Sequence, residues 1–400
     1  MGKWQIKKLG SICDFQGGSQ PPKSNFIYEP RKGYVRFLQI RDFASDKHIT
    51  YIPESKKNRM CDECDVLLGR YGASVGKVLV NQKGAYNVAV MKTIPDTNIL
   101  NRTYLYYYLT SDEFQKRLSQ VAARSAQAGF SKEDIYNFPV LTPPLSEQKR
   151  IVSVLDEVLE KTAKAKENAE KNLQNARELF ESYLQSVFAN PGDDWEEKTL
   201  GDVAKVIGGY SFKSTDFKKE GKYQVIRMGN VRSGIIRENE SPVYIDRLDD
   251  GVLKKALLLL NDVIITQTGT NKKRDYGFTV LIEKENYLLN QRISAIRFPK
   301  HYMPKLFLYF SWTDLFKDQY FANETGTVGQ GNVGIGAIIN AVVPFPPIKT
   351  QQIIIDRLDT LSNETKKLEA IYQQKLADLE ELKKSVLQKA FNGELVGAQS

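Results

Sequence analysis

Two similar stretches of sequence constrain this chain more than any other feature. The first is PPLSEQKRIVSVLD, from Pro143 to Asp156, and the second is PPIKTQQIIIDRLD, from Pro346 to Asp359, 203 residues later. Other matches precede them: the openings at Trp4 and Trp195, the pairs Gly17-Gly18 and Gly208-Gly209, and the segments CDVLLGRYG from Cys64 and NDVIITQTG from Asn261. A whole module has been duplicated, so the chain must fold as two copies of one unit.

Each copy has two parts of different character. The first part alternates short β-type runs with Gly-, Pro- and Asn-rich turns and one or two helical stretches, which predicts a compact α+β domain. The second part lacks internal Gly and Pro and is rich in Ala, Leu, Glu, Lys and Gln, which predicts one long helix. The predicted divisions are a domain over 1–145, a helix over 146–190, a second domain over 195–345 and a second helix over 346–394.

The two predicted helices begin after proline pairs and carry heptad patterns. Pro143-Pro144 and Pro346-Pro347 exclude helix upstream, and Ser146 is the expected N-cap of the first helix. In the first helix the expected a positions are Leu155, Thr162, Ala169, Ala176 and Tyr183, and the d positions are Val158, Ala165, Asn172, Leu179 and Ser186. In the second they are Leu358, Thr365, Tyr372, Leu379 and Val386, with Leu361, Leu368, Lys375, Leu382 and Lys389.

The first seam is rich in alanine and buries little by itself, so we expect the two helices to pair with each other in antiparallel orientation. The alternative is that each helix packs on its own domain.

Positive charge is concentrated in the two predicted domains. The net charge is +9, and residues 1–145 hold 21 Lys and Arg against 13 Asp and Glu, while 195–345 hold 21 against 17. The helical segments are acidic or neutral, with 7 against 10 over 146–194 and 8 against 8 over 346–400. Two basic domains favour a polyanionic partner such as duplex DNA.

No segment resembles a membrane span or a signal peptide, and three cysteines fit a reducing compartment, which predicts a cytoplasmic protein without membrane association.

The duplicated Pro-Pro-Leu/Ile-x-x-Gln-x-x-Ile at each helix start resembles the specificity subunit of type I restriction-modification enzymes, and the resemblance extends over essentially the whole chain. It implies two α/β target-recognition domains separated by two long antiparallel coiled-coil helices. Each domain would read one half of a bipartite DNA sequence, and the helices would set the spacing and dock methyltransferase subunits. Thr350 departs from the pattern, because the first copy has Glu147 there.

The same resemblance implies which partners carry the chemistry. Double-stranded DNA, methyltransferase subunits and restriction or translocase subunits are the expected partners. S-adenosylmethionine, ATP and magnesium are expected in those subunits, and no cofactor, metal or catalytic residue is expected in this chain. The competing function class is a coiled-coil adaptor whose basic domains bind proteins or other polyanions, and salt-dependent binding to a bipartite duplex separates the two.

Candidate base-reading residues are polar side chains in turns beside short strands, since Arg, Asn, Gln and Lys can contact base edges or phosphates. In the first domain they are Gln39, Arg41, Arg70, Tyr71, Ser74 and Lys77. In the second domain they are Arg227, Asn230, Gln267, Asn271, Lys272, Lys273, Arg274 and Tyr276. The alternative for each is an ordinary solvated turn residue.

Three further motifs do not support a catalytic or metal site. The G-x-G-x-x-G spacing at Gly329, Gly331 and Gly334 has no predicted strand before it, so a loop approaching the DNA backbone, or a tight turn, is favoured over a dinucleotide site. GASVGKV from Gly72 lacks the spacing and the final hydroxyl of a phosphate-binding loop. Cys61 and Cys64 form a C-x-x-C that the second copy does not repeat, which argues against zinc.

Overall fold

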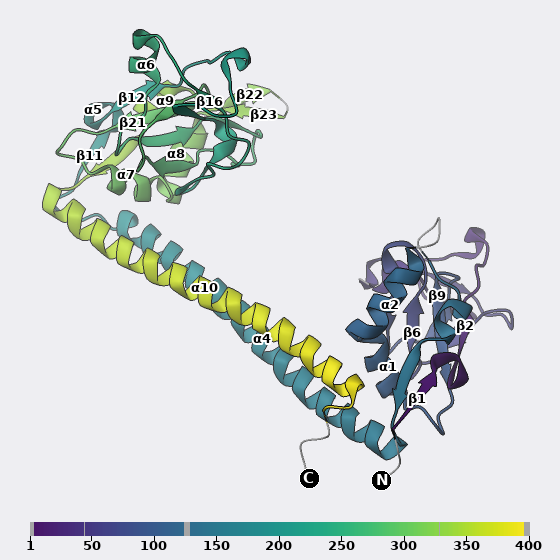
Figure 1. Ribbon diagram of the computed structural model, residues 1–400. Coiled ribbons are helices and arrows are strands. Elements are labelled where there is room, and N and C mark those ends of the chain that lie inside the picture. Colours follow the sequence, from purple (N-terminus) through teal and green to yellow (C-terminus); the bar gives the residue numbers. More distant parts are fainter. Residues whose placement is uncertain (1–3, 44, 124–128, 328, 396–400) are drawn as a thin grey trace. The chain divides into compact units, whose positions relative to one another are not determined.

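The computed structural model describes residues 4–43, 45–123, 129–327 and 329–395 (Figure 1). The chain forms two compact units, one of Met1–Lys171 with Gln373–Ser400 and the other of Asn172–Tyr372. Each unit holds one α+β domain together with part of both long helices, α4 (Leu145–Ala189) and α10 (Ile348–Asn392). Among the described residues, no helix combines the length and the apolar character that crossing a bilayer requires.

The first unit contains two four-stranded sheets and a two-stranded one. The order in one is β2 (Cys13–Gly17), β9 (Val90–Pro95), β6 (Leu67–Gly69), β7 (Val78–Leu79), and in the other β4 (Tyr51–Pro53), β3 (Tyr34–Leu38), β8 (Gly84–Tyr86), β5 (Met60–Cys61). β1 (Gln5–Lys8) pairs with β10 (Pro139–Thr142). The helices of this domain are α1 (Arg102–Thr110), α2 (Asp112–Ala122) and α3 (Lys132–Tyr136).

The second unit repeats this topology. Its four-stranded sheet has the order β12 (Lys205–Gly208), β21 (Ile293–Arg297), β17 (Val263–Thr266), β19 (Thr279–Leu281), and a three-stranded sheet has the order β16 (Tyr244–Ile245), β13 (Tyr223–Ile226), β20 (Tyr287–Leu289). β13 runs parallel to β20 as β3 does to β8, and β11 (Glu196–Thr199) pairs with β24 (Val342–Phe345) as β1 does with β10. The duplication in the sequence is therefore a duplication of fold.

The remaining elements of the second unit are short. Its helices are α5 (Leu200–Val203), α6 (Asp250–Ala256), α7 (Pro304–Phe310), α8 (Asp314–Ala322) and α9 (Ile335–Ile339). Its other strands are the pair β14 (Val231–Arg232) and β15 (Ile235–Ile236), and the sheet of β18 (Thr268–Gly269), β23 (Gln330–Asn332) and β22 (Thr325–Thr327). The Gly-rich stretch thus forms a hairpin of β22 and β23, which corrects the expectation that no strand precedes its glycines; residue 328 lies outside the described residues.

The repeated glutamine explains why both copies share the segment that begins with the proline pair. Gln148 is fully buried: its Nε2 donates to the carbonyl oxygens of Ile99 and Pro143, each at 2.8 Å, and its Oε1 accepts from the N–H of Asn101 at 2.8 Å. Asn101 is the N-cap of α1. Its side-chain oxygen accepts hydrogen bonds from the free N–H groups in the first turn of that helix. One side chain therefore joins the start of the long helix to the start of the first domain helix.

Gln351 makes the same three bonds in the second unit. Its Nε2 donates to Pro346 at 2.9 Å and His301 at 3.2 Å, and its Oε1 accepts from the N–H of Met303, the N-cap of α7, at 2.7 Å. A tyrosine on each domain helix adds a further contact: Tyr107 donates to Asp156, and Tyr309 donates to Asp359. The repeated segment after each proline pair is thus the junction that fixes each long helix to its domain.

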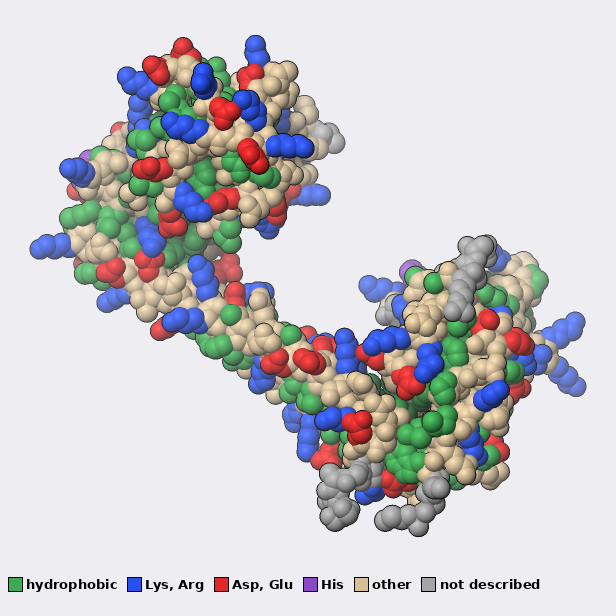
Figure 2. Space-filling view, in the orientation of Figure 1, with side chains coloured by type: hydrophobic (Ala, Val, Ile, Leu, Met, Phe, Trp, Pro, Cys, Tyr) green, Lys and Arg blue, Asp and Glu red, His purple; other side chains and the backbone are tan. Residues whose placement is uncertain are grey.

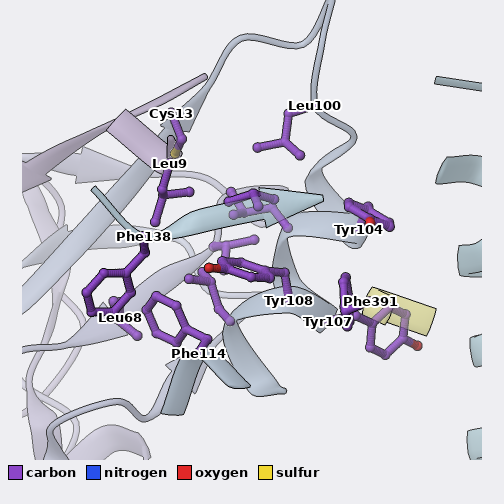
Figure 3. Packing of buried hydrophobic residues seen from close by; sticks show 14 of the residues in the cluster. Leu9, Cys13, Leu68, Leu100, Tyr104, Tyr107, Tyr108, Phe114, Phe138 and Phe391 are labelled. Atoms are coloured by element: carbon purple, nitrogen blue, oxygen red, sulfur yellow. The ribbon is translucent and has the colours of Figure 1, made fainter. Parts of the chain in front are cut away.

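Residues from both long helices complete the core of each domain. In the first unit Ile151 and Leu155 of α4 and Leu387 and Phe391 of α10 join one buried cluster with the tyrosines of α1. The Phe391 ring lies 5.1 Å from that of Tyr104 and close to that of Tyr108 (Figure 3). In the second unit the matching residues are Leu184 and Phe188 of α4 with Ile354, Ile355 and Leu358 of α10.

The two long helices pair with each other in antiparallel orientation within each unit. Lys166 contacts Glu380 at 2.7 Å in the first unit, and Arg177 contacts Glu369 at 2.8 Å in the second. Eleven residues forward along α4 correspond to eleven residues back along α10, so both ion pairs belong to one register. The long helices therefore pair with each other and also pack on the domains, so the two expected arrangements do not exclude each other.

The predicted a positions are buried or half-buried, whereas the predicted d line is only partly correct, with Val158, Ala165 and Leu361 half-buried. Leu155, Ala169, Ala176 and Leu358 are buried, and the two a-position threonines, Thr162 and Thr365, are buried with them. The d-position leucines Leu179, Leu368 and Leu382 instead expose 59%, 41% and 45% of their surface. Another half-buried line lies one residue further on, at Leu173, Phe180 and Leu376. Because both lines follow the same period, sequence periodicity does not distinguish them.

The helix ends also differ in detail from the prediction. α4 begins at Leu145, and the Pro144 carbonyl accepts from the N–H groups of Glu147 and Gln148, so Ser146 is inside the first turn and is not the N-cap. α10 ends at Asn392, two residues before the end of the predicted range. Gly393 has a φ of +81°, and the N–H of Glu394 donates to Lys389, which is a Schellman cap.

Candidate nucleic-acid interface

A tight turn after the central strand carries the first candidate residues in both domains. After β3, the N–H of Gln39 donates to the buried carboxylate of Asp42 at 2.7 Å; after β13, the N–H of Arg227 donates to the buried amide of Asn230 at 3.1 Å. The two turns are the 3-10 helices η3 (Ile40–Phe43) and η7 (Met228–Asn230). Burial raises the pKa of Asp42, and the hydrogen bond from the Gln39 N–H partly offsets that rise. Because the two turns make the same bond, Gln39 and Arg227 occupy equivalent positions.

The side chains of these turns differ in their contacts. Gln39 is half-buried and donates to Thr50 at 3.1 Å, while Arg41 is exposed and its Nη2 donates to the same hydroxyl at 2.6 Å. Arg227 is half-buried, its Nη2 donates to the Ser241 carbonyl, and its buried Nε has no partner among the described residues. The structure brings Gln39 and Arg41 together in one domain and leaves Arg227 beside a cleft in the other.

A second turn, missed by the sequence reasoning, lies directly against the first. It is Asn87–Ala89 between β8 and β9, and residues 290–292 between β20 and β21. The Asn87 N–H donates to the Leu38 carbonyl, and the Asn290 N–H donates to the Ile226 carbonyl. The signal in the sequence was the asparagine that follows the matching strands in both copies.

The glycine pairs shape this part of each domain. A Cβ on Gly18 would lie 2.0 Å from the carbonyl oxygen of Asn87, and a Cβ on Gly209 would lie 1.9 Å from that of Asn290. Any side chain at either position would collide with backbone. The second glycine of each pair is therefore required for the close approach of the two segments.

The loop after β6 holds four candidates of the first domain. The Arg70 Nε donates to the Phe130 carbonyl at 2.8 Å, and its guanidinium lies 4.9 Å from the centre of the Tyr71 ring. Tyr71 exposes 42% of its surface and Lys77 is exposed, whereas Ser74, in η5 (Gly72–Ser74), is buried. Tyr71 and Lys77 are accessible to a ligand, and Ser74 is not.

In the second domain the loop 270–277 is held from within. The Asp275 carboxylate accepts from the Thr270 N–H at 2.7 Å, and hydrogen bonds from Thr270 lower its pKa. Glu324 accepts from the Lys272 N–H and from the Tyr276 hydroxyl, and burial together with Glu324 raises the pKa of Tyr276. The loop therefore has a defined shape at its tip, where Lys272 and Lys273 are exposed.

Asn271 and Arg274 of this loop are partly engaged. Asn271 is half-buried and donates weakly to the Thr327 carbonyl at 3.4 Å. Arg274 is exposed, its Nη1 donates to Asp318 at 2.8 Å, and its guanidinium lies 5.4 Å from the centre of the Phe321 ring. A DNA phosphate would compete with Asp318 for this guanidinium, so Lys272 and Lys273 are the freer cations of the loop.

The fold buries four of the predicted base readers, contrary to the expectation that turn residues are exposed. The exposed fractions are 4% for Ser74, 3% for Asn230, 7% for Gln267 and 3% for Tyr276. Asn230 donates to the carbonyls of Arg237 and Glu240, and Gln267 donates to Val333 and accepts from Ser294. Such side chains hold the framework and do not reach a base edge.

Lys and Arg side chains project from the surface of both domains, with acidic side chains among them on the visible face (Figure 2).

The cysteines do not form a ligand group. Burial raises the pKa of Cys61 to about 11 and that of Cys13 to about 12, and Cys64 is exposed beside Arg102. Across the described ranges, no group of three or more His, Cys, Asp or Glu side chains is arranged to hold a metal ion.

Comparisons with known proteins agree with this architecture. The family model described as "Type I restriction modification DNA specificity domain" matches residues 1–174 and again 192–378. The specificity subunit of the type I restriction enzyme MjaVIII from Methanocaldococcus jannaschii is 24% identical, covering 98% of this chain and 93% of the relative. The EcoKI specificity subunit of Escherichia coli K12 is 23% identical, covering 98% and 89%.

Two solved structures share the fold. One, described as the structural basis of complex assembly and conformational transition of the type I R-M system, has a TM-score of 0.77 at 17% identity, covering 98% of both chains. The HsdS subunit from Thermoanaerobacter tengcongensis has a TM-score of 0.62 at 18% identity, covering 98% and 97%. Because the family model matches both copies and most of the chain, this protein belongs to the DNA specificity subunits of type I restriction-modification systems.

Proposed function

We propose that each α+β domain reads one half of a bipartite DNA target. The observation that carries this proposal is a shared backbone framework with different side chains at equivalent positions, Gln39 against Arg227 being one example. A common framework presents both domains to DNA in the same way, and different side chains select different bases. The reading domains are 1–145 and 195–345, and Arg41, Tyr71, Lys77, Lys272 and Lys273 are accessible candidates for DNA contact.

The helices, 146–190 and 346–394 in the sequence-based division, fix the spacing between the half-sites in this proposal. A continuous helix of 45 residues is stiff and rises 1.5 Å per residue, so its length converts directly into distance along the duplex. The antiparallel ion pairs and the buried glutamine junctions support this role, because they hold each helix against its neighbour and its domain.

The exposed apolar residues of the paired helices form the docking surface for a methyltransferase subunit. In the second unit Leu179, Tyr183 and Leu361 line a shallow groove of about 480 Å³ between α4 and α10, and Leu368 is exposed further along α10. A methyltransferase subunit is the occupant we propose, since a chain of the same fold was solved in a study of type I complex assembly. Leu179→Lys with Leu368→Lys should abolish co-purification of that subunit, while the exposed-site control Gln374→Lys should not.

In this proposal the chain supplies recognition and carries no catalytic site. Methylation and cleavage belong to partner subunits that hold S-adenosylmethionine, ATP and magnesium, and the complex acts in the cytoplasm, where the DNA is. Purified chain that transferred methyl groups without any partner would contradict this division of labour.

Binding of purified complex to duplex DNA tests the central proposal. The affinity for duplex should fall steeply with salt as counterions are released, and methylated sites mapped in cells should share a two-part sequence with a fixed gap. A flat salt response with no two-part sequence would instead support the coiled-coil adaptor.

A further inference from the structure

The second turn occupies the same place in both domains. The carbonyl of Ala89 accepts from the Arg70 N–H at 2.9 Å, and the carbonyl of Arg292 accepts from the Gln267 N–H at 2.9 Å. Together with the matching bonds made by Asn87 and Asn290, these contacts make Val88 equivalent to Gln291 and Ala89 equivalent to Arg292. The framework is constant, so any difference in recognition here comes from two side chains.

Those side chains differ completely in chemistry. Val88 exposes 39% of its surface, so its methyl groups are accessible to a ligand. Gln291 and Arg292 are both exposed. Gln291 accepts from Ser211 at 3.1 Å, whereas the Arg292 guanidinium makes no hydrogen bond or ion pair with any residue that the structure describes.

The backbone at Arg292 is strained. Its φ is +67°, a conformation that residues with a Cβ rarely adopt, while Ala89 does not share it. Such strained residues gather at ligand-contacting positions. The fold holds this arginine in a conformation that its own propensity disfavours.

Arg292 also stands at the edge of a cleft of about 600 Å³. Arg227, Gly229, Asn290 and Gln291 line the same cleft, and the buried Nε of Arg227 lacks a partner among the described residues. The acidic residue of the cleft, Glu240, already accepts from Arg237 at 3.0 Å. The Arg292 guanidinium and the Gln291 amide nitrogen therefore line a concave surface with free donors, which suits acceptor-rich base edges.

We infer that this turn reads a base in each half-site, with Arg292 contacting a guanine in one half and Val88, one position earlier in the equivalent turn, contacting a thymine methyl in the other. This rests on the proposed function. Arginine forms paired hydrogen bonds with O6 and N7 of guanine, and an apolar side chain recognises the C5-methyl of thymine. The two half-sites therefore differ at this base.

Mapping methylated sites in cells that carry the complete system tests the inference. Arg292→Ala should relax one guanine in one half-site, with discrimination at that base falling about 5- to 150-fold, and should leave the other half unchanged. Arg292→Asn, which tolerates a positive φ, should give the same result if the side chain and not the backbone is responsible. Arg247→Ala removes an exposed arginine of the same domain outside the cleft and should change nothing.

The reciprocal exchange identifies the other half. Val88→Gln with Ala89→Arg should replace a thymine preference by guanine in the half-site that Arg292→Ala leaves intact. An unchanged sequence in both experiments, or a change in both halves from one variant, would overturn the inference. If the unaltered protein yields no two-part sequence at all, the proposed function fails instead, so the two failures are distinguishable.

Discussion

Replacing Gln351 with leucine should destabilise the second unit through the loss of three hydrogen bonds at the helix junction. The side chain is fully buried, and its bonds to Pro346, His301 and Met303 measure 2.9, 3.2 and 2.7 Å. A protein hydrogen bond contributes about 1 kcal/mol net, and a buried partner left without one costs about 1–3 kcal/mol. The free energy of unfolding should therefore fall by about 2–4 kcal/mol.

For a unit of this size each kcal/mol lowers the melting temperature by about 2–4 °C, so we expect a decrease of roughly 5–15 °C. Tryptophan fluorescence during thermal unfolding measures it, because Trp195 and Trp312 lie in the second unit and Trp4 in the first. Gln352→Leu is the matched control. That neighbouring glutamine is exposed, and among the described residues its side chain bonds to Asp356 alone, four residues on, so its loss should cost under about 0.5 kcal/mol.

Equal melting temperatures for Gln351→Leu and Gln352→Leu would refute the reasoning, since burial and the three bonds would then contribute nothing. Gln148→Leu supplies an independent check, because the same bonds join α4 to the first domain. Its effect should be seen in the fluorescence of Trp4.

Three further perturbations test other parts of the molecule. Four residues inserted at Asn172 of α4, with a matched insertion in α10, should lengthen the helix pair by ~6 Å and widen the gap between half-sites by about one or two base pairs, and an unchanged gap would contradict the spacer role. Lys272→Ala with Lys273→Ala should weaken binding to all duplexes alike and reduce the slope of log affinity against log salt by about two, and an unaltered slope would count against these phosphate contacts. Replacing the whole loop Asn271–Arg274 should alter only one half-site, and effects on both halves would count against independent reading. Gly209→Ala should destabilise the second unit by about 1–3 kcal/mol in chemical denaturation, because its Cβ would meet the Asn290 carbonyl at 1.9 Å, while the unobstructed Gly229→Ala should be neutral.

The sequence alone determined the large-scale organisation of this protein. The duplication, the α+β character of each copy and both long helices follow from local patterns, because helix and strand preferences depend on near neighbours and on the placement of Pro and Gly. The helix starts at the proline pairs and the stop at Gly393 were predictable for the same reason, although the Ser146 cap was not correct.

Only the tertiary structure decided which polar and apolar side chains are available. Asn230 and Gln267 have the chemistry of base readers, yet bonds to Arg237, Glu240, Ser294 and Val333 bury them. Arg292 drew no attention in the sequence, yet it stands exposed at the edge of a cleft. Exposure depends on residues that are distant in the chain, such as Val333, which lies 66 positions from Gln267, and no local pattern carries that information.

Contacts between residues distant in the chain also decide which line of side chains is buried between the two long helices. Periodicity gave the buried line through Leu155 and Leu358 but not its neighbour, since the lines through Leu179 and through Phe180 have the same spacing. The domain packed at each helix end selects between them, and that choice leaves Leu179 and Leu368 exposed.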